Sequence, residues 1–439
     1  MTRYLSFLPA LLFLVIAVPA KAIEIKEVVS PKGIKAWLVE DHANPIVTLH
    51  FVFRGGIALD PAGKEGLANL VASTLDEGGG NLTSQKFQRK LEDKAISLGF
   101  DASRDGFSGS LRTLTRNQDT AFDLMRLAVT KPRFDSEAVE RIRNQIMAGI
   151  RRNSENPQRI AAHNFYLKMF PNHPYGRPSD GNLESIRIIK LVDLKLFVSQ
   201  RLALDNLIIS AVGDITPGKL KTVLDQIFGA LPPKASPWKI TEITPQSANS
   251  TVVIEKSIPQ SVILFGQAGI KRNHPDFYAA YVMNYVLGGG GFESRLYEEI
   301  REKRGLAYSA YSYLYPLDHA GLIIGGTSTA NARVNETLSV LKNEWRRMSQ
   351  KGLTPEELKD AKTYLTGSYA LRFSSSQRIA RMMTGIQLEK LGIDYIEKRN
   401  GYIQSVTLAH TNRVAAKLLD PNNLTTVIVG KPDGVKATP

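Results

Sequence analysis

The sequence contains no cysteine among its 439 residues. That absence excludes a disulfide framework, a zinc site with cysteine ligands and a thiol nucleophile. The chain also has little long apolar sequence. Its apolar stretch from Leu5 to Val18 is shorter than the roughly 20 residues needed to span a bilayer. Pro9 and Pro19 further disfavour a membrane helix, and we expect no stable membrane span.

The first 22 residues have the pattern of an export signal. Arg3 gives a positively charged start, the apolar stretch follows, and Ala20-Lys21-Ala22 matches an A-x-A cleavage site. The mature chain should then begin near Ile23 and work in a bacterial-type periplasm or outside the cell. An uncleaved anchor is the alternative interpretation of this segment.

Positive charge exceeds negative charge along the chain. The formal net charge is +14, and because Arg3 and Lys21 are the only charges of the leader, the mature chain would carry +12. Such a protein could favour acidic peptides or the anionic cell envelope. No nucleic-acid partner is expected, because the Lys and Arg residues are spread out and no recognised binding motif accompanies them.

An internal repeat organises the chain. The tetrapeptide Gln158-Arg159-Ile160-Ala161 recurs as Gln377-Arg378-Ile379-Ala380, an offset of 219 residues. Three further landmarks recur in the same order at similar spacing: the helix starts 134–137 and 353–356, the pair Asn206 and Asn423, and the glycine clusters 78–80 and 288–291. The repeat predicts two homologous halves.

Each half mixes short strand-like runs with longer helical ones. The β-branched and aromatic runs 47–56 and 261–269 predict buried strands, and acidic first turns open predicted helices at 136–152 and 355–373. We therefore expect an α+β fold made of two homologous domains, each a mixed β-sheet covered by helices. The expected segments are a signal peptide (1–22), an N-terminal domain (23–230), a proline-containing linker (231–248) and a C-terminal domain (249–433).

Residues 53–80, FRGGIALDPAGKEGLANLVASTLDEGGG, are similar to the opening motif of the insulinase/pitrilysin zinc peptidases, including the mitochondrial processing peptidase type. In that family a Gly-Leu-Ala stretch runs into H-x-x-E-H on a helix. The two His bind zinc, and the Glu between them activates the bound water. A Glu on a later helix is the third ligand. The resemblance spans nearly the whole chain after the leader.

Gly66-Leu67-Ala68 fits the lead-in of that motif, but the metal positions are degenerate. Asn69 takes the first His position, Ala72 the Glu position and Ser73 the second His position, while Gly149 falls at or beside the third ligand. Ala and Gly offer no donor atom, and Ser and Asn are poor zinc ligands. The resemblance therefore implies a chain that binds no metal of its own.

The seven histidines offer no obvious replacement site. His42 and His50 share strand parity, yet eight residues of strand would set them roughly 26 Å apart. His163 and His173 do not have helical i, i+4 spacing. We interpret the histidines as surface or hydrogen-bonded side chains.

Residues 287–315 closely resemble the family's C-terminal-domain motif, in which a glycine-rich turn and a helix precede Arg-x6-Tyr. The pair here is Arg301 and Tyr308. The resemblance implies that Arg301 holds a substrate carbonyl oxygen and that the Tyr308 hydroxyl supports the developing oxyanion, over a zinc site in the other domain or subunit. From the residues alone, a solvent-facing arginine and a strand aromatic facing away from Tyr311 and Tyr313 remain open interpretations.

The glycine cluster Gly288, Gly289, Gly290 and Gly291 precedes that helix. It lacks the lysine of a P-loop and the spacing of a dinucleotide fingerprint, which disfavours a phosphate cradle. The resemblance implies a flexible, peptide-contacting loop. A simple connection between helices is the alternative.

Two functions follow from this sequence. The first is a non-catalytic subunit of a heterodimeric periplasmic zinc metallopeptidase. A homologous partner would carry the zinc, and this chain would close the other half of a clam-shell chamber around unfolded peptides and supply Arg301 and Tyr308. The alternative is a metal-free peptide-binding or scaffold protein with no role in catalysis. The retained Arg–Tyr pair favours the first, because a scaffold needs no oxyanion donor.

Overall fold

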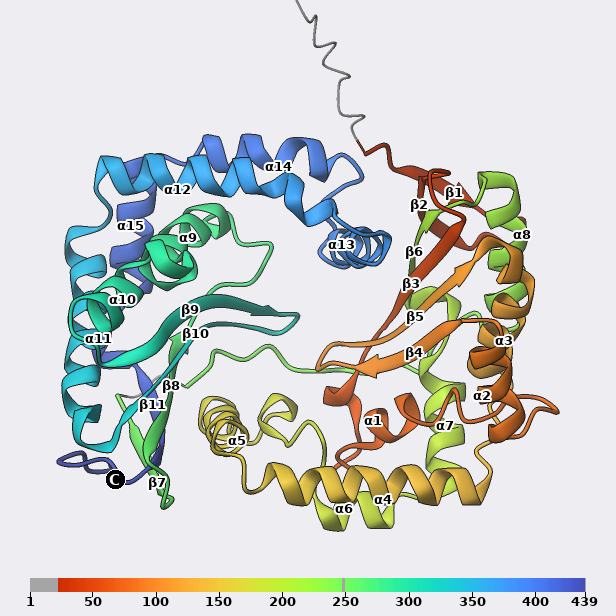
Figure 1. Ribbon diagram of the computed structural model, residues 1–439, viewed down its shortest axis with the longest axis horizontal. Coiled ribbons are helices and arrows are strands. Elements are labelled where there is room, and N and C mark those ends of the chain that lie inside the picture. Colours follow the sequence, from red (N-terminus) through yellow and green to blue (C-terminus); the bar gives the residue numbers. More distant parts are fainter. Residues whose placement is uncertain (1–22, 247–248, 439) are drawn as a thin grey trace, which may run out of the picture.

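The computed structural model describes residues 23–246 and 249–438, which form two halves facing each other (Figure 1). Each half is built on one β-sheet with helices around it. The predicted signal peptide, residues 1–22, lies outside the described residues. Within the described ranges, no helix combines the length and the apolar character needed to cross a membrane.

The N-terminal half holds a six-stranded sheet in the order β1-β2-β6-β3-β5-β4. Its strands are β1 (Lys26–Val29), β2 (Lys35–Glu40), β3 (Ile46–Arg54), β4 (Ser97–Ala102), β5 (Gly106–Leu114) and β6 (Leu207–Gly213). Its helices are α1 (Leu67–Ala72), α2 (Ser84–Asp93), α3 (Gln118–Thr130), α4 (Ser136–Asn153), α5 (Pro157–Met169), α6 (Leu183–Ile188), α7 (Leu191–Arg201) and α8 (Pro217–Phe228), with a 3-10 turn η4 (Leu204–Asn206).

The C-terminal half holds a five-stranded sheet in the order β7-β11-β8-β10-β9. Its strands are β7 (Thr251–Glu255), β8 (Gln260–Ala268), β9 (Ala307–Leu317), β10 (Ala320–Ala330) and β11 (Thr425–Gly430). Its helical elements are α9 (Phe277–Asn284), η5 (Tyr285–Gly289), α10 (Arg295–Tyr297), η7 (Glu298–Glu302), α11 (Val334–Lys351), α12 (Pro355–Gly367), α13 (Ser376–Leu388), α14 (Tyr395–Gln404), α15 (Leu408–Leu418) and η10 (Pro421–Asn423).

The two sheets repeat one topology. The order β2-β6-β3-β5-β4 corresponds to β7-β11-β8-β10-β9, and in each sheet the first pair is parallel while the other pairs are antiparallel. Strand β1 extends the N-terminal sheet by antiparallel pairing with β2. The predicted α+β fold, with two mixed sheets covered by helices, is confirmed.

The halves exchange one helix each. Helix α5 of the N-terminal half packs on β8 and β11 of the C-terminal sheet, and helix α13 of the C-terminal half packs on β3 and β6 of the N-terminal sheet (Figure 1). The repeated tetrapeptide begins both helices, and its alanines, Ala161 and Ala380, are both buried at these contacts. Each exchanged helix thus covers two inner strands of the opposite sheet, which are largely buried, whereas the edge strands β4 and β9 stay partly exposed.

Helix α13 also makes polar contacts with the N-terminal sheet. Thr384 Oγ1 lies 3.0 Å from His50 Nδ1 of β3 and donates to Ser210 Oγ of β6 at 3.1 Å. Gln387 Nε2 donates to Ser210 Oγ at 2.9 Å. Burial lowers the pKa of His50 to about 4, and the charge of Arg381 acts in the same direction. His50 is therefore neutral in the folded protein near pH 7.

The packing of α5 against the C-terminal sheet should contribute strongly to stability. Phe165 is fully buried, and its ring packs on Gly266 of β8, where a side chain would clash with it. We predict that Phe165→Ala lowers the free energy of unfolding by about 3–5 kcal/mol, measured by urea denaturation. Leu167→Ala on the same helix is the control, because Leu167 is 51% exposed. Equal losses in the two variants would contradict the exchanged-helix core.

The His50 contact should make stability depend on pH. Because the folded state binds a proton on His50 less readily than the unfolded chain, the stabilisation exists above pH 6.5 and is lost as pH falls toward 4. We predict that His50→Gln removes part of this acid loss, at most about 3 kcal/mol, in thermal melts across that window. His163→Gln serves as the control. If the stability of His50→Gln falls with decreasing pH as steeply as that of the unmodified protein, the acid loss does not come from His50.

Candidate functional site

The four degenerate metal positions come together in space. Asn69, Ala72 and Ser73 belong to α1 and its C-terminal cap, Gly149 belongs to α4, and all four line one pocket of about 240 Å³. We call it the degenerate pocket. A Cβ added at Gly149 would meet no atom within 4 Å, so the position opens into free space.

Asp60 fixes the start of α1. Its carboxylate accepts hydrogen bonds from the backbone N–H of Gly66 at 2.8 Å and of Ala68 at 3.0 Å. Gly66 has a φ of +91°, a left-handed conformation that glycine adopts without strain. Burial raises the pKa of Asp60 to about 7, against the opposing effect of the two hydrogen bonds. The turn before α1 thus fixes the position of the helix that carries Asn69 and Ala72.

The side chain of Asn69 forms hydrogen bonds within the fold. Its Nδ2 donates to the Ser179 carbonyl at 2.6 Å and lies 3.4 Å from Asp180 Oδ1. Asp180 and Asp101 also line the degenerate pocket, and Asp101 belongs to the edge strand β4. Sequence reasoning missed both carboxylates, because neither belongs to the H-x-x-E-H segment and only the fold brings them to α1.

The residues present do not fit a zinc ion. The degenerate pocket offers an amide, a hydroxyl and the carboxylates of Asp101 and Asp180, but no imidazole lines it. In the part of the chain that the structure describes, no group of three or more His, Cys, Asp or Glu side chains is placed to hold a metal. Most histidines instead hydrogen-bond within the fold: His42, His50, His173, His274, His319 and His410.

A larger cavity of about 630 Å³ adjoins the degenerate pocket and shares Ile150, Asn153 and Asp180 with it. Arginines from three segments line this cavity: Arg104, Arg159 and Arg177. The guanidinium of Arg104 stacks 3.6 Å from the ring centre of Tyr166. Cationic side chains around an open cavity suit acidic groups of a ligand.

Arg301 and Tyr308 are neighbours in the C-terminal half. The Arg301 Cζ lies 4.6 Å from the ring centre of Tyr308, 4.9 Å from that of Tyr297 and 6.0 Å from that of Phe292. Aromatic faces hold the guanidinium by cation–π attraction. Its Nε lies 3.6 Å from Glu302 Oε1, a contact with an exposed carboxylate. Tyr308 is 82% exposed. The pair can therefore present a cation and a phenol to a molecule outside this chain.

A β-bulge lies beside Tyr308. The register of β9 against β10 shifts between Thr327 and Thr329, opposite residues 307–310. The bulge interrupts the alternation of side chains along β9, and Tyr308 and Tyr311 are both exposed. Bulges often redirect a side chain next to a functional site. Simple alternation therefore does not describe this part of the strand.

The glycine cluster is less loop-like than the sequence predicted. Gly288 and Gly289 belong to the π-helical segment η5, and a Cβ on Gly288 would lie 2.4 Å from Ser312 Oγ of β9. Close packing against β9 therefore accounts for Gly288. Gly291 has a φ of +59° and open space around it, so the turn itself is confined to the end of the cluster. Peptide contact by these glycines stays a prediction.

The two parts of the candidate site do not meet within this chain. Figure 1 shows α1 and α4, which form the degenerate pocket, in one half, and α10, which precedes Arg301, in the other. The structure brings Asn69, Ala72, Ser73 and Gly149 together and brings Arg301 to Tyr308. It does not bring the first group to the second.

The degenerate pocket should accept zinc once its ligands are restored. We predict that the variant combining Asn69→His, Ala72→Glu, Ser73→His and Gly149→Glu binds about one zinc per chain, because α1 and α4 already hold these positions around open space. Metal content after dialysis and competition with a chelating dye would measure it. The same variant with Gly149 kept is the control and should bind zinc more weakly. Equal zinc in the unmodified chain would contradict the geometry.

Family models match two parts of this chain. Residues 35–181 match the family described as insulinase (peptidase family M16), and residues 189–365 match the peptidase M16 inactive domain. A non-peptidase homolog, YmxG of Helicobacter pylori, is 30% identical over 395 residues, which cover 89% of this chain and 90% of that protein. An uncharacterized zinc protease of Streptomyces coelicolor is 27% identical over 70% of this chain and 68% of its own length.

A solved structure shares the whole arrangement. The crystal structure of a peptidase M16 inactive domain from Pseudomonas fluorescens has a TM-score of 0.87 and 29% sequence identity, and the match covers 95% of this chain and 100% of that one. Family profiles, a relative aligned over nearly its full length and the fold point to the same group. The chain therefore belongs to the insulinase family, peptidase family M16, as a homologue of its peptidases without their zinc ligands.

Proposed function

We propose that this chain is the non-catalytic subunit of a heterodimeric periplasmic zinc metallopeptidase. The observation that carries the proposal is the pairing of the half-buried Arg301 with the exposed Tyr308, stacked at 4.6 Å, in a chain whose own metal positions lack the side chains that zinc needs. A homologous partner supplies the zinc and the activated water. This chain supplies a cation and a phenol to the opposite side of the substrate.

The chemistry of the pair suits that task. During peptide hydrolysis negative charge develops on the carbonyl oxygen, and preorganised donors lower the barrier most when water is excluded. The guanidinium of Arg301 would hold the substrate carbonyl, and the Tyr308 hydroxyl would donate to the oxyanion. Because 82% of the Tyr308 surface is exposed in the isolated chain, the pair gains its dry environment only when a partner closes over it.

The substrates are unfolded peptides that enter between the two subunits. The cavity lined by Arg104, Arg159 and Arg177 favours peptides with acidic residues. The free edges of β4 and β9 offer unpaired backbone groups for an extended chain. The leader predicted at residues 1–22 would direct this chain to the periplasm, so the proposed partner and the peptides it cleaves would be found there.

The proposal predicts activity only in a mixture. Purified with a homologue that carries H-x-x-E-H, the chain should give peptidase activity that neither protein shows alone. We expect Arg301→Ala to lower kcat about 10²-fold and Tyr308→Phe about 10-fold or more, as for other lost oxyanion donors, measured with a fluorogenic peptide. Tyr311→Phe, on the same strand, is the control. Size-exclusion chromatography would show that each variant still forms the complex.

Activity that is indifferent to both substitutions would favour the alternative, a metal-free peptide-binding or scaffold protein. Peptide cleavage by this chain alone, in proportion to bound zinc, would overturn both functions.

A further inference from the structure

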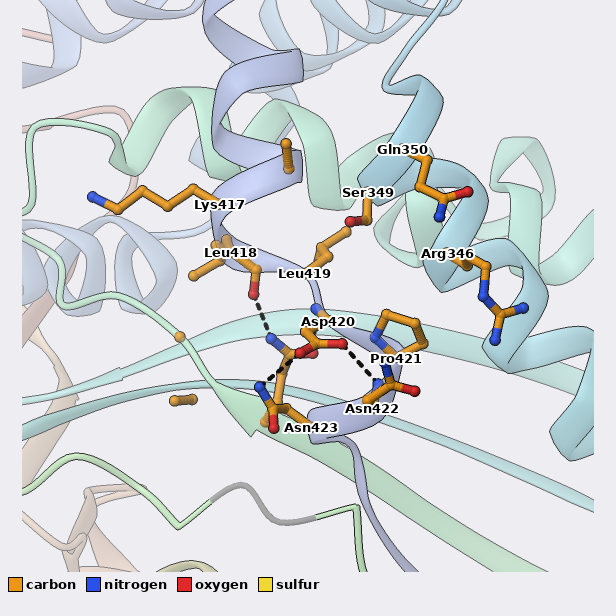
Figure 2. A pocket seen from close by; sticks show the side chains of 14 residues that line it. Arg346, Ser349, Gln350, Lys417, Leu418, Leu419, Asp420, Pro421, Asn422 and Asn423 are labelled. Atoms are coloured by element: carbon orange, nitrogen blue, oxygen red, sulfur yellow. Dashed lines mark hydrogen bonds between the residues drawn. The ribbon is translucent and has the colours of Figure 1, made fainter.

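A third open pocket lies in the C-terminal half, at residues that line neither of the two pockets described above. It has a volume of about 550 Å³ and is formed where β8, α11, α15 and η10 meet (Figure 2). Its lining includes Arg346 of α11, Lys417 at the end of α15, and Asp420 and Asn422 around η10. We call it the C-terminal groove. Nothing in the family's metal chemistry or in the Arg–Tyr pair uses it.

The internal repeat identifies the position in the N-terminal half that is equivalent to the C-terminal groove. Helix α7 and turn η4 correspond to α15 and η10 at a constant offset of 217 residues. In the N-terminal half, linker residues 232–238 run across this place without regular secondary structure. Ala235 N–H donates to Asp205 Oδ1 at 2.9 Å, and Ser236 N–H donates to the Gln200 carbonyl at 2.8 Å.

The C-terminal groove keeps the same acceptors. At the offset of 217, Lys417 corresponds to Gln200 and Asn422 to Asp205, so a backbone carbonyl and a side-chain oxygen recur at the two positions. Within residues 23–246 and 249–438, no hydrogen-bond donor reaches either of these two acceptors. One contact is lost, because Leu204 N–H binds the Pro232 carbonyl whereas its counterpart, Pro421, has no N–H.

The C-terminal groove and the equivalent position in the N-terminal half differ in charge. Figure 2 shows Arg346 and Lys417 on opposite sides of Asp420. The Asp420 carboxylate is already engaged, since Asn422 N–H and Asn423 Nδ2 both donate to it, at 2.8 and 2.9 Å. Arg346 donates to Asn343 Oδ1 at 2.8 Å. Among the described residues, no acidic side chain forms an ion pair with Arg346 or Lys417, so their charges are available to an acidic occupant. In the N-terminal half the segment in this place carries Lys234, and Lys239 follows it directly, so a groove lined by Arg346 and Lys417 would repel a segment of that sequence.

We propose that the C-terminal groove binds an extended acidic segment of a partner protein, in the way that the N-terminal half seats its own linker. The backbone N–H groups of that segment donate to the Lys417 carbonyl and to Asn422 Oδ1, and its carboxylates face Arg346 and Lys417. The chain's own C-terminal residues are held elsewhere, because Asp433 N–H donates to the Asn331 carbonyl and Thr438 N–H donates to the Thr251 carbonyl. The proposal does not depend on catalysis by the complex.

Two synthetic peptides test it. One has the sequence of residues 231–240, and the other carries Lys234→Glu and Lys239→Glu in that sequence. Both are labelled and titrated with the whole mature chain by fluorescence anisotropy at two salt concentrations. We expect the acidic peptide to bind about tenfold more tightly than the basic one. We also expect Lys417→Glu and Arg346→Glu to weaken its binding about fivefold each, and together to reverse the preference.

The control is Lys221→Glu, an exposed lysine of α8 in the other half, which should leave the affinity unchanged. If Lys221→Glu weakens the acidic peptide as much as Lys417→Glu does, the attraction is non-specific and the proposal fails. It also fails if neither peptide binds. Sedimentation of the unliganded chain gives the remaining outcome. A dimer that Lys417→Glu dissociates would assign the groove to a second copy of this chain instead.

Discussion

The rest of the structure depends on the reciprocal exchange of α5 and α13. Each half covers one face of its sheet with a helix of the other half, so neither core is complete alone. Phe165 of α5 packs on β8 of the C-terminal sheet, and Thr384 of α13 hydrogen-bonds to β6 of the N-terminal sheet. This arrangement keeps α1 and Arg301 in opposite halves. Under the proposed function, a site that uses both kinds of chemistry would draw one of them from a second subunit.

Duplication explains how one scaffold carries unlike surfaces. The same sheet order occurs twice, yet α1 and α4 surround a pocket, while the other half presents Arg301 and Tyr308. The same contrast applies at the ends of α7 and α15, where one half seats the linker and the other leaves a basic groove. In each case the fold is kept and the side chains differ, so the helices stay in place when their first function is lost.

Much of this could be predicted from the sequence. The repeated tetrapeptide at 158–161 and 377–380 indicated two homologous halves, and the β-branched and aromatic runs 47–56 and 261–269 indicated β3 and β8. The sequence could not predict the helix exchange, because the burial of Ala161 and Ala380 does not say which sheet covers them. Asp180 reaches the degenerate pocket only through the fold. The bulge beside Tyr308 likewise depends on pairing with β10.

The central claim is that the metal belongs to a partner and faces Arg301 and Tyr308. The most direct measurement is anomalous diffraction at the zinc edge from crystals of the complex with an H-x-x-E-H homologue. The account predicts one zinc per heterodimer, bound by the partner, with the Arg301 guanidinium and the Tyr308 hydroxyl on the opposite side of the substrate cleft. A zinc peak between α1 and α4 of this chain would contradict it.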